Sequence, residues 1–230
     1  MNLNIPYMET DNKLLNDAYR IAAGDIVGNI VYYQNGLLTE EKPCMIAGLD
    51  YNTPWTRDTA INIWNVLSIL SPEVSKNTLL AVLEEEEGNI YIGGQYWDSI
   101  IWMIGAREYC RFHKDDNFYR LAFEAGRNSV HRLEEDEFDE EDGLFRGPAV
   151  YGDGIAAYPD KYSKCPNQGS GILEWVDYPG NPVYPKGYGI PMKALSTNCV
   201  YFKVYEILAE MAHALGEPAK EFEEKAAAMK

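Results

Sequence analysis

Apolar residues recur every three or four positions along most of the chain, a spacing typical of amphipathic helices. In the first part of the chain it predicts helices over residues 11–30, 57–70, 72–86, 98–113 and 117–135. Only Ser71 separates the second helix from the third, and a short polar turn separates the last two. We therefore expect these two pairs to form helical hairpins.

The periodicity stops over residues 136–195, which hold most of the prolines, many glycines and a high density of aromatic residues. Connections between elements usually have about 4–6 residues, so a segment of this length is expected to be functional, disordered or partly stranded. Its aromatic content argues against disorder. Helical spacing resumes after Ser196-Thr197-Asn198, which has the composition of a helix cap, and predicts helices over 196–215 and 219–229. The sum predicts an all-α fold of helical hairpins in a single domain over residues 1–230.

Charge and hydropathy limit the partners. The formal net charge of −16 repels polyanions, and no basic stripe interrupts it, so we expect no nucleic acid and no anionic membrane surface as a partner. Neutral or cationic ligands fit better. The chain has no apolar run of 18 residues and its opening residues do not resemble a signal peptide, which predicts a cytoplasmic protein.

Aromatic residues stand next to acids at two predicted helix starts. The first group contains Trp55, Arg57 and Asp58, and the second contains Gln95, Trp97 and Asp98. An acid in the first turn is favoured by the helix dipole, so each aspartate has an ordinary role as a cap or first-turn acid. The alternative is that aromatic rings stack on sugars while charged groups bind hydroxyls.

Two further groups of this kind lie in the long segment 136–195. One is Tyr151 with Asp153, which stands between two glycines, and the other is Glu174 with Asp177. The acidic run over 134–142 before them is interpreted as a solvated helix end. Isolated histidines predict no metal site, and the absence of a phosphate or dinucleotide motif predicts no cofactor. Carboxylates therefore remain for catalysis, and paired carboxylates are what glycoside hydrolysis uses.

Four segments in order carry a resemblance to a known family: TPWTRDTAINIWN, GGQYWDSIIWMIGA, DEEDGLFRGPAVYGDG and STNCVYFKVYEILAEMA. Together they resemble the (α/α)6 six-hairpin glycoside hydrolases, nearest the family 63 group of processing α-glucosidases and mannosylglycerate hydrolases. The resemblance covers the chain from about Tyr51 onward. It implies a toroid of helical hairpins with the long loop 136–195 on its active face, and inverting acid/base hydrolysis of α-linked or small neutral glycans.

The resemblance also implies roles for individual residues. Asp153 matches the family's general acid, while Glu174 and Asp177 stay as alternatives because YGDGIAAYP replaces the family's W-D-D-S-P-R type of segment. The remaining positions resemble the walls of the sugar pocket: Trp55, Arg57, Asp58, Gln95, Trp97, Asp98, Tyr151, Glu174 and Asp177.

Length adds a further expectation. A complete barrel of six hairpins needs about twelve helices of roughly 12 residues each, more than 230 residues provide. The resemblance thus implies an incomplete toroid that carries the acid and lacks the base. Its exposed apolar helix faces predict a homodimer or a complementing C-terminal half. The alternative function is a non-catalytic carbohydrate-binding or scaffold protein.

Overall fold

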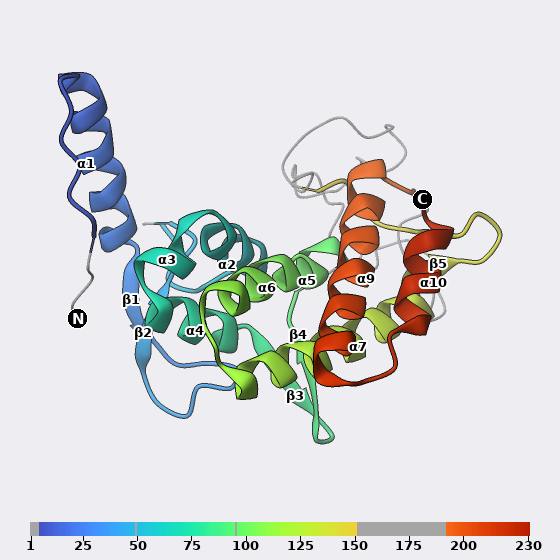
Figure 1. Cartoon of the computed structure of the whole chain (residues 1–230). Coiled ribbons are helices and arrows are strands. Elements are labelled where there is room, and N and C mark those ends of the chain that lie inside the picture. The colour runs from blue at the N-terminus through green and yellow to red at the C-terminus, as the bar shows by residue number, and fades with distance from the viewer. Residues whose placement is uncertain (1–4, 49, 95, 151–191) are drawn as a thin grey trace, which may run out of the picture. The chain divides into compact units, whose positions relative to one another are not determined.

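The computed structural model describes residues 5–48, 50–94, 96–150 and 192–230. Their contacts divide into two compact units, one formed by Met1–Gly94 with Trp102–Ala122 and the other by Gln95–Ile101 with Phe123–Lys230. Most of the helices and strands of both are labelled in Figure 1. Whether the two units act as a single domain, as the sequence suggests, stays a prediction.

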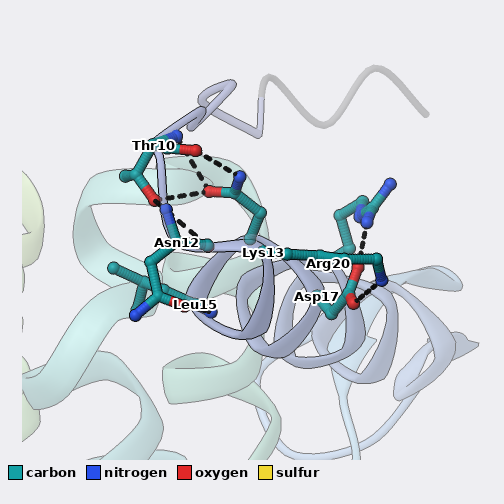
Figure 2. Close-up of polar contacts among 7 residues, drawn as sticks. Thr10, Asn12, Lys13, Leu15, Asp17 and Arg20 are labelled. Atoms are coloured by element: carbon teal, nitrogen blue, oxygen red, sulfur yellow. Dashed lines mark hydrogen bonds and ion pairs between the residues drawn. The ribbon is translucent and has the colours of Figure 1, made fainter.

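The first unit starts with helix α1 (Lys13–Gly28), which polar side chains hold at its start (Figure 2). Asn12 Oδ1 accepts a hydrogen bond from Leu15 N at 3.3 Å, and Asp17 forms ion pairs with both Lys13 and Arg20. None of the residues of α1 is buried. A helix of this length gains little stability without packing. Four of its apolar side chains are exposed: Leu14, Leu15, Ile21 and Val27.

Two hairpins of short strands follow in the same unit. Strand β1 (Ile30–Tyr33) pairs with β2 (Lys42–Met45), and β3 (Leu83–Glu86) pairs with β4 (Asn89–Ile92), both antiparallel. In the second hairpin the turn residues Glu87 and Gly88 both have positive φ angles, 52° and 80°. This backbone matches the twist of paired strands, which explains a two-residue turn at this point.

The helices of the first unit pack closely on each other. They are α2 (Thr56–Asn62), the π-helical segment η1 (Ile63–Leu67), α3 (Ser68–Leu70), α4 (Pro72–Ala81) and α6 (Trp102–Phe112). A Cβ added to Gly105 in α6 would lie 2.8 Å from Ala60 Cα in α2, so the two backbones are almost in contact. Trp102 is fully buried and donates from Nε1 to Leu79 O at 3.2 Å.

The second unit contains α5 (Trp97–Ile100), most of α7 (Asp116–Glu137), the hairpin of β5 (Phe138–Asp139) and β6 (Leu144–Phe145), α9 (Leu195–Leu215) and α10 (Lys220–Ala228). The rings of Phe145 and Tyr201 stack at 3.5 Å between centroids with an interplanar angle of 2°. Phe123 and Phe222 meet edge to face at 6.2 Å. Aromatic packing between α7, β6, α9 and α10 therefore forms this core.

The predicted all-α toroid of helical hairpins is wrong. Three two-stranded antiparallel sheets interrupt the helices, which makes the fold mixed α and β. The predicted helix over 72–86 ends at Ala81 and is followed by β3, because the acidic residues Glu84 to Glu86 pair across the hairpin with Asn89 to Tyr91. Pairing across a tight turn overrides the helix propensity of glutamate here.

Several helix boundaries are confirmed. Ser71 caps α4 by accepting from Val74 N, and Gly216 ends α9 in the left-handed region at φ 70°. The helical spacing of Ala60, Trp64 and Leu67 predicts one buried face for the helix over 57–70, and this is wrong for Trp64. Trp64 is 49% exposed, while Ile63 and Leu67 are buried. The π-helical turn over Ile63–Leu67 changes the angular period of the helix and turns Trp64 outward.

Candidate functional site

Two exposed aromatic residues and a charged pair stand at the start of α2 in the first unit. Trp55 occupies the N-cap position and is 39% exposed, and the ring of Tyr51 meets it edge to face at 6.2 Å between centroids. The Arg57 guanidinium carbon lies 4.8 Å from the centroid of the Trp55 ring, and Arg57 Nε lies 3.7 Å from Asp58 Oδ2. We call these four residues the α2 platform.

Buried threonines fix the orientation of the α2 platform. Thr56 and Thr59 face the protein, and Thr56 Oγ1 donates to Gly93 O at 2.8 Å. Gly93 cannot carry a side chain, since an added Cβ would lie 2.7 Å from Glu84 Oε1 and 2.8 Å from Val82 O. With the threonines turned inward, Trp55 is at the surface, and the side chains of Arg57 and Asp58 beside it are 18% and 36% exposed. An aromatic face beside a guanidinium and a carboxylate can stack on a sugar ring and bind its hydroxyls.

The second predicted group, at the start of α5 in the second unit, is buried. Trp97 is 2% exposed and Asp98 is 7% exposed. Tyr96, directly before them, has φ 50° and ψ −134°, a backbone conformation that non-glycine residues rarely adopt. The structure thus brings Trp97 and Asp98 together, but inside the unit rather than on its surface. Gln95 lies outside the described residues.

Tyr96 packs against the backbone of Gly147. A Cβ on Gly147 would lie 3.2 Å from Tyr96 Cδ1, and Gly147 has φ 140°, which only glycine adopts readily. The glycine of the R-G-P sequence therefore allows the chain to pass directly over the tyrosine ring.

The polar residues at the start of α9 hold the segment 145–150. Asn198 accepts from Phe145 N through Oδ1 at 2.8 Å and donates through Nδ2 to Phe145 O at 3.0 Å. Thr197 Oγ1 donates to Pro148 O, and Ser196 Oγ accepts from Val150 N at 3.1 Å. We call these three residues the α9 clamp.

The interpretation of Ser196-Thr197-Asn198 as a helix cap is therefore wrong. Helix α9 begins at Leu195, and its N-cap residue Ala194 makes no side-chain cap bond. The side chains of the α9 clamp are used for tertiary contacts, because Phe145 and Pro148 offer buried backbone groups that need partners.

The chain on both sides of the undescribed residues 151–191 is held together. Gly147 N donates to Met192 O at 2.9 Å, and Gly147 and Lys193 form a parallel bridge. Lys193 Nζ lies 2.8 Å from Asp139 Oδ2 and also pairs with Asp142. The two flanks of the long segment thus lie side by side in the second unit.

The candidate acid and its alternatives cannot be placed. Asp153, Tyr151, Glu174 and Asp177 all lie outside the described residues, so their predicted roles stay predictions.

Glu137 is a candidate that the sequence interpretation missed. It belongs to the acidic run taken as a solvated helix end, yet it is only 9% exposed, and its Oε2 atom is buried without a hydrogen-bond partner in the described part of the chain. Burial, together with the charge of nearby Asp136, raises the pKa of Glu137 to about 8. Its spacing of four and seven from Leu133 and Val130 places it on the apolar face of α7, and this was the signal available in the sequence.

One group has the ligand types of a metal site. Ligand atoms of His131, Glu134 and Glu221 lie within 4.8 Å of one another. However, Lys225 Nζ lies 2.7 Å from Glu134 Oε1 and 2.5 Å from Glu221 Oε1. The lysine ammonium already supplies a positive charge to both carboxylates, so the arrangement is an ion-pair network.

Comparisons with known proteins give no relative. No family model, curated protein or solved structure matches the chain. Within the described residues no helix is both long and apolar enough to cross a membrane.

Proposed function

We propose that this chain is a sugar-binding segment of an inverting glycoside hydrolase acting on α-linked or small neutral glycans. The observation that carries the proposal is the α2 platform, in which the exposed Trp55 ring lies against the guanidinium of Arg57, which in turn pairs with Asp58. These are the residues that the ordered sequence resemblance assigns to the terminal sugar. The resemblance of the sequence to the family supports the proposal independently of the toroid, which the chain does not form.

In the proposed reaction Asp153 donates a proton to the leaving glycosidic oxygen while a carboxylate base activates a water molecule on the opposite face of the sugar. The base comes from a second copy of the chain or from a complementing segment. Helix α1, whose apolar stripe is exposed, supports a partner of this kind. A cytoplasmic location belongs to the same proposal and has support from the sequence alone.

The first test is calorimetric titration of gluco- and manno-configured disaccharides into the chain, with the molar mass measured by light scattering. We expect Trp55→Ala to weaken binding about tenfold, which corresponds to a lost contact of about 1.4 kcal/mol. Trp64→Ala is the matched control, since Trp64 is also an exposed tryptophan of the first unit but is outside the α2 platform. Equal loss in both variants, or no binding by the wild type, would reject the proposal.

A second measurement separates hydrolysis from binding alone. Release of free sugar by a dimer, lost in Asp153→Asn with binding retained, supports the hydrolase. Binding by a monomer without sugar release supports a non-catalytic carbohydrate-binding protein. Full turnover by Asp153→Asn transfers the acid's role to Glu174 or Asp177.

A further inference from the structure

The second unit contains a cavity of about 380 Å³ that the sugar proposal does not use. It lies where the end of α7, the β5–β6 hairpin, α9 and α10 come together, and Gly143 of the hairpin turn forms part of its rim. Its size is in the range of pockets that hold small molecules, which begins at about 300 Å³.

The walls of this cavity are mainly apolar. They include the side chains of Phe138, Tyr205, Ala228 and Met229. Phe138 is held by an edge-to-face contact with the buried ring of Phe145 at 5.0 Å, and Tyr205 is almost completely buried. Two aromatic rings thus have fixed positions in the wall. A ligand with an apolar body would displace water from these surfaces.

The charged groups around the cavity are mostly acidic. Glu134, Glu135 and Glu140 line it, against a single lysine, Lys225. The Lys225 ammonium lies 2.8 Å from Glu134 Oε2 and 2.5 Å from Glu221 Oε1, so its charge is neutralised inside the wall. Glu134 also accepts a hydrogen bond at Oε1 from the Tyr205 hydroxyl, at 2.5 Å.

Glu140 differs from the other acids of the wall. It is exposed on the β5–β6 turn, and its carboxylate forms no ion pair within the described ranges. It can therefore accept the charge of a ligand without breaking an existing contact. The net charge of −16 also raises the concentration of cations near the protein.

We propose that this cavity binds a small organic cation, an ammonium group on an aromatic or aliphatic body. Apolar walls hold the body, and Glu140 pairs with the ammonium group at the rim. The Tyr205 ring does not take part in this pairing, because it already faces the Lys225 ammonium, which lies 5.8 Å from the ring centroid. A divalent metal ion fits poorly, because Lys225 already occupies the position between Glu134 and Glu221. An anion is disfavoured by the three carboxylates.

Isothermal titration of the whole chain with three probes of similar size tests the charge preference. Benzyltrimethylammonium is the cation, benzyl alcohol the neutral probe and benzoate the anion. We expect the cation to bind about ten times more tightly than the alcohol, because only the cation gains the charge of Glu140, and benzoate not to bind. Equal binding of cation and alcohol, or binding of none, overturns the proposal.

Two variants locate the site. Glu140→Gln is expected to weaken binding of benzyltrimethylammonium several-fold, while its neighbour Glu141→Gln, exposed on the same turn and outside the cavity lining, leaves it unchanged. Met229→Trp fills the cavity and is expected to abolish binding, provided that its circular dichroism is unaltered. If Met229→Trp misfolds, the two glutamate variants still decide, and equal affinities for these two overturn the proposal.

Discussion

Helices α2 and α5 begin with similar residues and place them in opposite environments. Trp55 precedes α2 and Trp97 opens α5, and each helix carries an aspartate in its first turn. In α2 the tryptophan is at the surface and two threonines are buried. In α5 all four residues are buried, including the tryptophan and the aspartate.

The comparison shows what an aromatic residue followed by an acid can predict. The pattern predicts a helix start in both places, because the dipole favours an acid in the first turn. It does not predict which side chains a ligand can reach, since that depends on which face of the helix packs on the protein. The following variants test whether burial accounts for the difference.

The largest expected effect is that of Trp97→Ala. Truncation of a buried tryptophan leaves a cavity and is expected to lower the free energy of unfolding by about 3–5 kcal/mol. Trp55→Ala, at the surface, is expected to lower it by less than about 1 kcal/mol. Urea denaturation followed by circular dichroism measures both. Similar losses in the two variants would show that the environments of α2 and α5 do not differ as described.

Glu137 and Glu141 extend the comparison to acids, one buried and one exposed. The native pKa of Glu137, about 8, is above its ordinary value of 4.5, so the native protein keeps a proton that the unfolded chain releases. Stability is therefore expected to fall as the pH rises from about 5 to about 8, by an amount on the order of 2–4 kcal/mol. Glu137→Gln should remove this dependence.

Urea midpoints recorded between pH 5 and pH 9 measure the effect. Glu141→Gln is the control, because Glu141 is exposed and its replacement should leave the slope of the wild type. A wild-type slope that persists in Glu137→Gln would assign the dependence to another group.

The sequence predicted helix ends better than it predicted strands or the site. Ser71-Pro72 and Gly216 are strong local signals, because a cap bond or a left-handed residue is needed at those points whatever the tertiary structure. The strands β3 and β4 have four residues each, too few for a clear alternation, and β3 contains three glutamates that favour helix.

In the candidate site, too, contacts between sequence neighbours could be predicted and contacts between distant residues could not. Proximity of Trp55, Arg57 and Asp58 could be predicted, since they are neighbours on one helix turn. The contacts of Asn198 with Phe145 could not, because they join residues that are 53 positions apart and replace a local capping role. Side chains such as Asn and Ser can bind local or distant backbone equally well, and the fold decides between them.

A buried asparagine of the α9 clamp, Asn198, can be compared with an exposed asparagine, Asn65. Asn198→Ala leaves the buried N–H and C=O of Phe145 without partners and is expected to cost about 2–3 kcal/mol. Asn65→Ala removes one exposed bond, from Nδ2 to Ile61 O, and should cost less than about 0.5 kcal/mol. Hydrogen exchange at Phe145 should accelerate in the first variant alone, and unchanged protection there would contradict the role of the clamp.

The smallest expected effect on stability is that of Arg57→Lys. This variant tests whether the arginine of the α2 platform serves ligand binding or only the local structure of α2. Lysine keeps the positive charge next to Asp58 but loses the planar group that lies 4.8 Å from the Trp55 ring. We expect the free energy of unfolding to change by less than about 0.5 kcal/mol, because lysine keeps the charge and the ion pair with Asp58, at 3.7 Å, is a weak one. Disaccharide binding should nevertheless weaken, since the guanidinium can form two parallel hydrogen bonds to neighbouring hydroxyls and an ammonium cannot. A variant that binds as tightly as the wild type would show that the stacked arginine serves only the local structure of α2.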